Sequence, residues 1–183
     1  MNVHFIWQKF INEGDSFSFS VLYNTYVDLL YAYGIHLGFQ DELCKDAIQD
    51  VFYKIYQSKN TLKKIKNPTA YLFKSYKYQL IDLARKEEKI SDVDLSSIGD
   101  DFTIDITVSD KIIEAEELML LKNKVEKMLK CLSGQQREAL YLKYVLELKY
   151  NEISEILQIN PDSVKKLIYR AMKMIRKNMG ETT

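Results

Sequence analysis

The sequence contains few residues that interrupt helices and few cysteines that could cross-link a small fold. It also lacks a long apolar segment that could cross a membrane. Its 183 residues include six Gly, two Pro and two Cys. Two cysteines, Cys44 and Cys131, cannot build a disulfide framework, and they fit a reducing compartment. The longest stretches without a charged residue, 16–27 and 29–40, are shorter than the roughly 20 apolar residues of a membrane span. The N-terminal residues lack the basic and apolar segments of a signal peptide. These absences predict a cytoplasmic protein without membrane insertion.

The net charge is zero, but the chain contains three blocks that are each dominated by charges of one sign, two of them basic and one acidic. The chain has 26 Lys and Arg against 26 Asp and Glu. Residues 54–86 carry nine basic residues and one acid, residues 87–117 carry two lysines and eleven acids, and residues 163–179 carry six basic residues and no acid. Because screening at cellular salt reaches only about 8 Å, each block acts locally. Zero net charge therefore does not exclude nucleic acid as a partner, and two basic blocks favour it over ordinary solvated helix faces.

The apolar residues follow a helical period. They recur at three- and four-residue spacing in most windows, and strict alternation over a strand length is rare. Two Asn-Pro pairs, Asn67-Pro68 and Asn160-Pro161, are typical of helix starts, since Asn caps free amides and Pro suits the first helical position. Ser133, followed three residues later by Gln136, predicts a capping box. The chain is therefore expected to be all-α.

A linker is expected in the middle of the chain. Residues 91–110 are rich in Ser and Asp and show weak helical periodicity. We therefore expect two small helical domains, 1–90 and 112–183, joined by an acidic linker at 91–111. The linker could span roughly 70 Å when fully extended. Phe102, Ile104 and Ile106 alternate within it, so part of it is expected to dock on the protein. Its acids are expected to shield the basic faces in the free protein.

The C-terminal part has the layout of a helix-turn-helix. Residues 149–157 predict a short amphipathic helix, 158–160 a turn, and Pro161 the start of a longer helix. The longer helix carries a basic edge that fits a major groove. This edge and its neighbours comprise Lys165, Lys166, Tyr169, Arg170, Lys173, Arg176 and Lys177. A solvated basic face is the alternative, and it ranks second because the capped turn and the acid-free face occur together.

Two helices are expected in the N-terminal part. Residues 41–58 predict a helix with an apolar face and an opposite polar face, and such a polar face by itself is usually solvated. The apolar face comprises Leu43, Ala47, Val51 and Ile55, and the polar face comprises Asp46, Gln49, Asp50 and Tyr53. Residues 68–86 predict a helix with aromatic residues among lysines, which suits single-stranded nucleic acid because rings stack on bases. Some of these rings must be core, with Leu72 beside Phe73 or Tyr76.

Three motifs make the sequence resemble a bacterial RNA polymerase sigma factor of the extracytoplasmic-function (ECF) group of the sigma-70 family. They are DAIQDVFYKIY, NPTAYLFKSYKYQLIDLARK and LSGQQREALYLKYVLELKYNEISEILQINPDSVKKLIYRAMKMIR. Their order and spacing are similar to the second and fourth conserved regions of that family, and the resemblance runs from about Phe19 to Met179. Three motifs in order are more specific than a lone helix-turn-helix.

The resemblance implies partners and roles for these residues. It implies core RNA polymerase and promoter DNA as partners, and an anti-sigma protein as a candidate partner. The polymerase contact would fall on Asp46, Gln49, Asp50 and Tyr53. Recognition and melting of the −10 element, partly single-stranded, would fall on Lys63, Lys64, Lys66, Asn67, Tyr71, Lys74, Lys77 and Tyr78. Recognition of the double-stranded −35 element would fall on Lys165, Lys166, Tyr169, Arg170, Lys173 and Arg176.

Some positions depart from the usual family pattern. Gln158 stands where the turn often has Gly, Leu167 where Arg is common, and Tyr78 where an Asn often helps to recognise the −10 element. Ser133-Gly134 stands at a helix start that usually contains proline. These departures leave the promoter sequence open.

Two other classes of function fit the sequence less well. A transcriptional regulator with an N-terminal sensor domain could use the same helix-turn-helix, but it would not need the two N-terminal motifs. An enzyme is disfavoured, because two His and two Cys, well separated in sequence, give no metal-binding spacing. The sequence also lacks a glycine-rich phosphate loop and a serine nucleophile motif. We therefore expect no catalytic residue, no metal and no cofactor.

Overall fold

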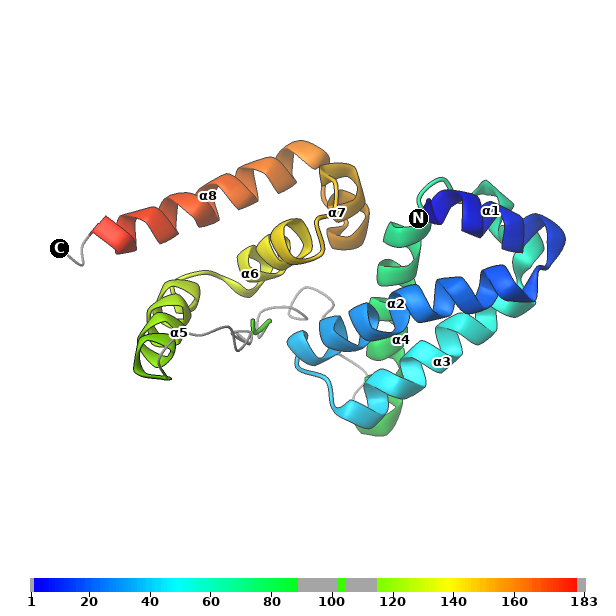
Figure 1. Ribbon diagram of the computed structural model, residues 1–183, viewed down its shortest axis with the longest axis horizontal. Helices are drawn as coiled ribbons and strands as arrows, with labels where there is room; N and C mark the ends of the chain where they lie inside the picture. The colour runs from blue at the N-terminus through cyan, green and yellow to red at the C-terminus, as the bar shows by residue number, and fades with distance from the viewer. Residues whose placement is uncertain (1, 89–101, 105–114, 181–183) are drawn as a thin grey trace.

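The computed structural model describes residues 2–88, 102–104 and 115–180, and every regular element within these ranges is a helix (Figure 1). The all-α prediction is confirmed. The N-terminal elements are α1 (Val3–Glu13), α2 (Ser16–His36), α3 (Asp41–Gln57), the 3-10 helix η1 (Lys59–Lys64) and α4 (Pro68–Glu88). The C-terminal elements are α5 (Ala115–Lys130), α6 (Gly134–Leu140), the π-helical turn η2 (Tyr141–Val145), α7 (Tyr150–Leu157) and α8 (Pro161–Gly180).

The predicted helix starts are confirmed by their capping bonds. The Asn160 side chain accepts a hydrogen bond from the Ser163 amide at 2.7 Å, just before α8 begins. Asn67 caps α4 in the same way, at a longer distance of 3.4 Å. Ser133 and Gln136 form the expected capping box at the start of α6. These ends need only residues within three positions of each other, which is why local sequence predicts them.

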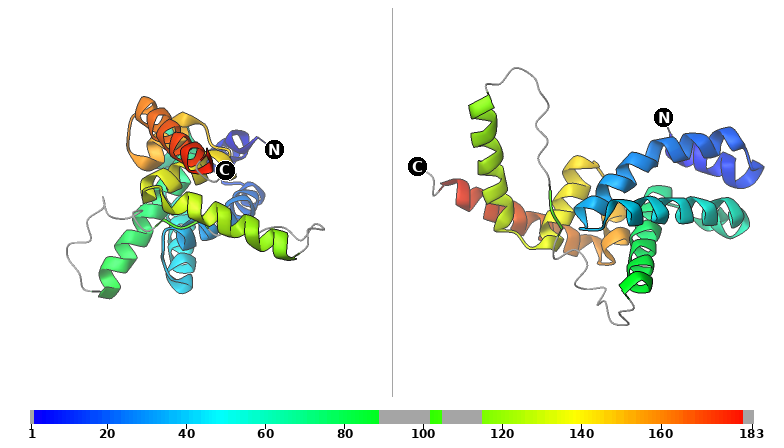
Figure 2. Two further views of the ribbon diagram at one scale, coloured as in Figure 1. Left: turned by 90° about the vertical axis from the view of Figure 1, so that its left-hand side faces the viewer. Right: turned by 90° about the horizontal axis from the view of Figure 1, so that it is seen from below.

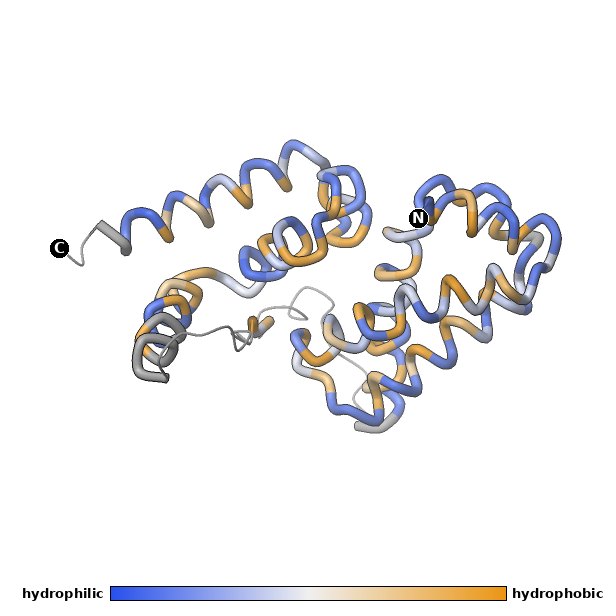
Figure 3. Tube along the Cα trace, viewed as in Figure 1, coloured by the Kyte–Doolittle hydropathy of each residue, from blue (hydrophilic) through white to orange (hydrophobic). Residues whose placement is uncertain are grey.

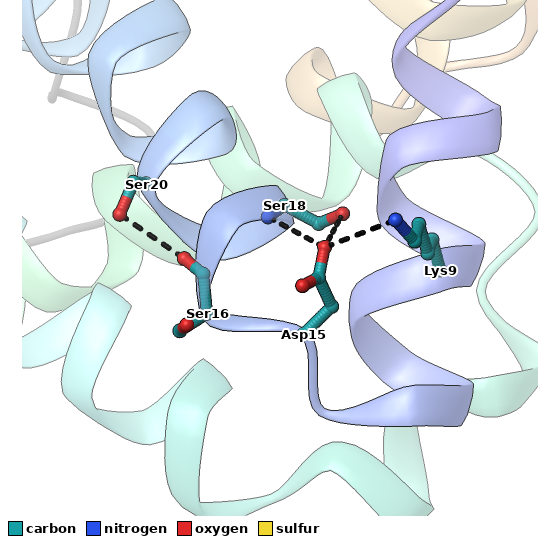
Figure 4. A network of polar contacts seen from close by, with 5 residues as sticks. All are labelled: Lys9, Asp15, Ser16, Ser18 and Ser20. Carbon is teal, nitrogen blue, oxygen red and sulfur yellow. Dashed lines mark hydrogen bonds and ion pairs between the residues drawn. The ribbon is translucent and has the colours of Figure 1, made fainter.

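Another cap shapes the turn between α1 and α2 (Figure 4). The Asp15 carboxylate accepts hydrogen bonds from the amide and the hydroxyl of Ser18, and it lies 3.4 Å from the Lys9 ammonium group. Hydrogen bonding to Ser18 contributes most to lowering the pKa of Asp15. The cap starts α2 and turns the chain so that α1 packs against α2.

The N-terminal core lies where the apolar faces of α1 to α4 meet. The predicted apolar face of α3 is buried throughout. Leu72, Phe73 and Tyr76 of α4 are at most 1% exposed, so both candidate rings on that helix, and not one alone, belong to the core. Trp7 and Phe10 of α1 close the other side of the core at 0% exposure.

The helix-turn-helix is present as α7 and α8. The first helix begins at Tyr150, one residue later than expected, because Lys149 is its N-cap and donates its amide to the Glu152 carboxylate at 2.6 Å. Ile153 and Ile156 of α7 pack with Val164 and Ile168 of α8 in the core. The alternating hydropathy along α8 is visible in Figure 3, with apolar residues turned toward α6.

Gln158 occupies the turn in a left-handed conformation with φ of 56°. A residue with a Cβ atom is strained in this backbone conformation, whereas glycine adopts it freely. Gln158→Gly is therefore expected to raise the free energy of unfolding by about 1 kcal/mol, measured by chemical denaturation. Glu155→Gly, one turn earlier inside α7, should lower it by about 1 kcal/mol, since helical glycine is unfavourable. A destabilised Gln158→Gly protein would contradict the strain argument.

The helices form two groups, α1–α4 and α5–α8, that touch along a seam (Figure 1). The seam joins α4 to α7, and Figure 2 shows α5 projecting away from the α1–α4 group. Phe102 of the predicted linker is 0% exposed, so the expectation that part of the linker docks is confirmed for this residue. Ile106 and the rest of the linker, 91–101 and 105–111, lie outside the described residues.

Candidate protein and nucleic-acid interfaces

The polar face of α3 lies outward, as the helical period predicts. Asp46, Gln49 and Tyr53 are exposed and Asp50 is half-buried, while the opposite face of α3 is in the core. We call these four residues the α3 stripe. The stripe presents two carboxylates and one phenol to a partner.

Asp50 is held from α4 by a residue that the sequence reasoning missed. The Gln79 amide nitrogen donates to the Asp50 carboxylate at 2.6 Å, and the Gln79 oxygen accepts from the Lys54 ammonium group at 2.5 Å. Gln79 is 5% exposed, so its polar atoms need these partners. Its position three residues after Tyr76, on the buried face of α4, was the sequence signal that could have predicted its burial. The α3 stripe and α4 are therefore connected by a buried amide.

An aromatic groove borders the α3 stripe. Phe19 and Tyr23 of α2 line it together with Phe52 and Tyr56 of α3, and three stripe residues, Gln49, Asp50 and Tyr53, form its edge. The Tyr23 and Phe52 rings are 4.9 Å apart, edge to face. Sequence reasoning did not single out these aromatics, although they recur at four-residue spacing within each helix. A partner on the stripe would meet apolar surface beside the carboxylates.

The residues expected at the −10 element fall into three places. Lys63 and Lys64 of η1, and Lys66 after it, are exposed. Lys74, Lys77 and Tyr78 of α4 instead line the seam, where they face α6 and α7. Asn67 caps α4, and the half-buried Tyr71 ring packs edge-on against Trp7 at 5.9 Å. In this arrangement the lysines of η1 and Lys66 are open to solvent, whereas the residues on α4 are partly covered.

The residues expected at the −35 element share one exposed face of α8. Tyr169 is 66% exposed, and Lys165, Lys166, Arg170, Lys173 and Arg176 are also exposed. The Lys165 ammonium group lies 3.1 Å from the Asp162 carboxylate, where both side chains are largely in water. Such a surface pair is weak, so Lys165 can exchange it for a phosphate.

The centre of the seam holds a buried carboxylate, Glu138. The Tyr33 hydroxyl donates to it from α2, and the Lys77 ammonium group lies 2.7 Å from it. Burial, then the neighbouring Glu138 charge, raise the pKa of Tyr33 well above its usual value. Tyr33 therefore stays protonated and can donate. Sequence reasoning did not single out Glu138.

The remaining titratable candidates are structural. Cys44 is 0% exposed, as expected for a core residue, and burial contributes most to raising the pKa of its thiol. His36 packs against the Phe102 and Tyr141 rings. Across the described part of the chain, His, Cys, Asp and Glu side chains form no group of three suited to a metal ion. The described helices include none with the length and apolarity to cross a membrane.

Comparisons with known proteins agree with this arrangement. Residues 22–90 match the family model for sigma-70 region 2, and residues 122–175 match the model for sigma-70 region 4. Among curated proteins, the chain is 24% identical to the ECF RNA polymerase sigma factor SigX of Bacillus subtilis (strain 168), over 88% of this chain and 84% of SigX. It is also 24% identical to SigW of the same organism, over 94% of this chain and 95% of SigW.

Solved structures share the fold. CnrH in complex with the cytosolic domain of CnrY matches with a TM-score of 0.62 at 17% identity, covering 100% of both chains. The sigma factor RpoE in complex with the anti-sigma factor NepR, from Bartonella quintana, matches with a TM-score of 0.56 at 20% identity, covering 90% of this chain and 98% of RpoE. At these identities the likeness concerns the fold.

The chain belongs to the sigma-70 family, as an RNA polymerase sigma factor of the ECF group. It acts in promoter-specific transcription initiation and is not an enzyme.

Proposed function

We propose that the α3 stripe binds core RNA polymerase, that η1 and α4 contact and open the −10 element, and that α8 contacts the −35 element. The observation that carries this assignment is the exposed basic face of α8 on a capped helix-turn-helix. The exposed, carboxylate-bearing stripe on α3 supports the polymerase contact, because the basic faces for DNA lie on other elements. The units would be residues 1–90 and 112–183, joined by the linker 91–111, in the cytoplasm.

Opening the −10 element needs polymerase as well as this chain. Extruding a base costs a few kcal/mol, and stacking on an aromatic side chain returns about 1–3 kcal/mol per base. Tyr71 and Tyr78 are the ring candidates, and the lysines of η1 would hold the phosphates. Two or three bases could be held in this way, whereas a full transcription bubble could not. The isolated protein is therefore expected to bind promoter duplex weakly.

The test is reconstitution with core polymerase. Stable co-elution, followed by run-off transcripts from discrete start sites on genomic templates, is the expected result. The mapped start sites would also identify the promoter. A sensor-type regulator would instead bind its own operator without polymerase. Nanomolar, sequence-specific binding of duplex by the free protein, with no association with polymerase, would contradict the proposed roles.

An anti-sigma protein is a further proposed partner. RpoE of Bartonella quintana was solved with the anti-sigma factor NepR, and CnrH with the cytosolic domain of CnrY. The shared fold supports a similar partner for this chain.

A further inference from the structure

The 3-10 helix η1, which carries two of the lysines expected at the −10 element, depends on its neighbours for its position. Its N-cap residue, Ser58, makes no side-chain capping bond. The hydrogen-bond geometry of a 3-10 helix is also poorer than that of an α-helix. Leu62 is 5% exposed and belongs to the core, whereas Lys63 and Lys64 are exposed. Contacts with other elements therefore decide where these two lysines lie.

Lys59, the first residue of η1, makes such a contact with two aromatic rings. Its ammonium group lies 4.5 Å from the centre of the Tyr56 ring of α3 and 5.2 Å from the centre of the Phe10 ring of α1. The two rings are stacked, with their centres 6.2 Å apart. Aromatic ring faces attract a cation within about 6 Å. Lys59 therefore connects η1 to both α1 and α3.

The Lys59 ammonium group also lies at the C-terminal end of α1. A Cβ atom at Gly14, the C-cap of α1, would lie 3.2 Å from the Lys59 nitrogen. The last turn of α1 contains no basic residue. A cation near a helix C-terminus interacts favourably with the helix dipole, and Lys59 supplies that cation from another element.

The helix α1 contacts both elements that are assigned to the −10 element. It packs against η1 and against α4. Its Trp7 ring, at 0% exposure, meets the edge of the Tyr71 ring of α4. The helix precedes the residues that match sigma-70 region 2, and it precedes the three sequence motifs. Its place in the structure therefore gives it a role that the motifs do not.

We propose that α1 positions η1 for the −10 element through Lys59, whose ammonium group is held by the Phe10 and Tyr56 rings. The DNA role of η1 in this statement rests on the proposed function. Lys59 is a positioning residue, because its ammonium group faces the rings and the end of α1, while Lys63 and Lys64 meet the phosphates. A loop that is already ordered loses less conformational entropy on binding, so its affinity is higher.

Two substitutions at Lys59 and one at Tyr56 test this contact. Lys59→Met keeps an unbranched apolar side chain but removes the cation. Lys59→Arg keeps a cation that binds ring faces, so it should restore the wild-type behaviour. Tyr56→Leu removes a ring that is 47% exposed, and it is combined with Lys59→Met in a double-mutant cycle. The matched control is Lys45→Met, at an exposed lysine of α3 that pairs with Asp41.

Hydrogen exchange of the full chain without DNA reports how firmly η1 is held. The Thr61 amide donates to the Ser58 carbonyl and the Ile65 amide donates to the Leu62 carbonyl, each at 3.0 Å. Both amides should exchange about tenfold faster in Lys59→Met, and at the wild-type rate in Lys59→Arg and in the control. Unchanged exchange in Lys59→Met would overturn the proposal, because a lysine that only contacts phosphate leaves the free loop unaffected.

The effect on DNA is measured with the holoenzyme at saturating polymerase. The probe is a labelled single-stranded oligonucleotide with the −10 sequence of a promoter mapped by run-off transcription. Lys59→Met should bind it about tenfold more weakly, and Lys59→Arg should bind it like the wild type. In the Tyr56→Leu background, Lys59→Met should cause little further loss, since both changes remove one contact. Losses that add would show that Lys59 binds phosphate directly, and they would overturn the proposal.

The outcomes separate this proposal from the proposed function. Faster exchange of η1 in Lys59→Met with an unchanged affinity for the oligonucleotide would show that Lys59 holds the loop without serving DNA binding. That result would overturn the positioning role and leave the proposed function intact. The proposed function fails in a different assay, when the wild-type protein directs no transcription with core polymerase.

Discussion

Asp50→Lys is expected to weaken association with core RNA polymerase by about a hundredfold, which corresponds to about 2.7 kcal/mol. Reversing a charge inside a protein interface replaces an attraction with a repulsion, and changes at paired interfacial charges commonly cost 2–5 kcal/mol. The same substitution breaks the bond from Gln79 and places a second cation beside Lys54, whose ammonium group bonds Gln79. Titrating labelled core polymerase with each variant measures the loss.

Two controls separate charge from position in this experiment. Asp50→Asn keeps an oxygen that accepts from Gln79 but loses the charge, so it should show a smaller loss, about tenfold. Asp28→Lys makes the same reversal at an exposed residue of α2 that lies outside the α3 stripe, and it should bind like the wild type. Equal affinities for Asp50→Lys and Asp28→Lys would remove Asp50 from the polymerase contact.

Arg170→Ala is expected to reduce binding of the holoenzyme to its promoter by about tenfold to a hundredfold and to relax the preference at the −35 element. An arginine that forms two hydrogen bonds to a base edge contributes about 1–3 kcal/mol of discrimination. Arg170 is exposed on the basic face of α8, where a helix in the major groove would place it near the bases. Filter binding on promoter variants substituted at the −35 element measures both effects.

Lys173→Ala tests the neighbouring phosphate contact. It should weaken binding to all promoter variants equally and reduce the slope of log affinity against log salt by about one unit. Lys127→Ala, at an exposed lysine of α5, is the matched control and should leave the slope unchanged. An unchanged salt slope for Lys173→Ala would exclude a phosphate contact at Lys173. For Arg170→Ala, equal weakening of binding to all promoter variants would indicate a phosphate contact and not base recognition.

The helices and the two outward faces were predictable because their causes are local. The caps at Asn67, Ser133 and Asn160 act within three residues, and the apolar periods of α3 and α8 place their charged residues outward. The backbone strain at Gln158 could be predicted only in part from the sequence. The sequence shows a residue where glycine is usual, and the structure adds its left-handed backbone.

The sequence by itself determined an all-helical fold, the helix starts at Asn67, Ser133 and Asn160, and the residues that form the α3 stripe and the basic face of α8. Only the tertiary structure decided how these parts are connected. Gln79 meets Asp50 across 29 residues, Lys77 meets Glu138 across 61, and Tyr33 meets Glu138 across 105. Helical periodicity shows which face of a helix is buried but not which helix covers it, since packing partners depend on the whole folded chain. The seam, with Phe102 bound between two helix groups, could therefore be found only in three dimensions.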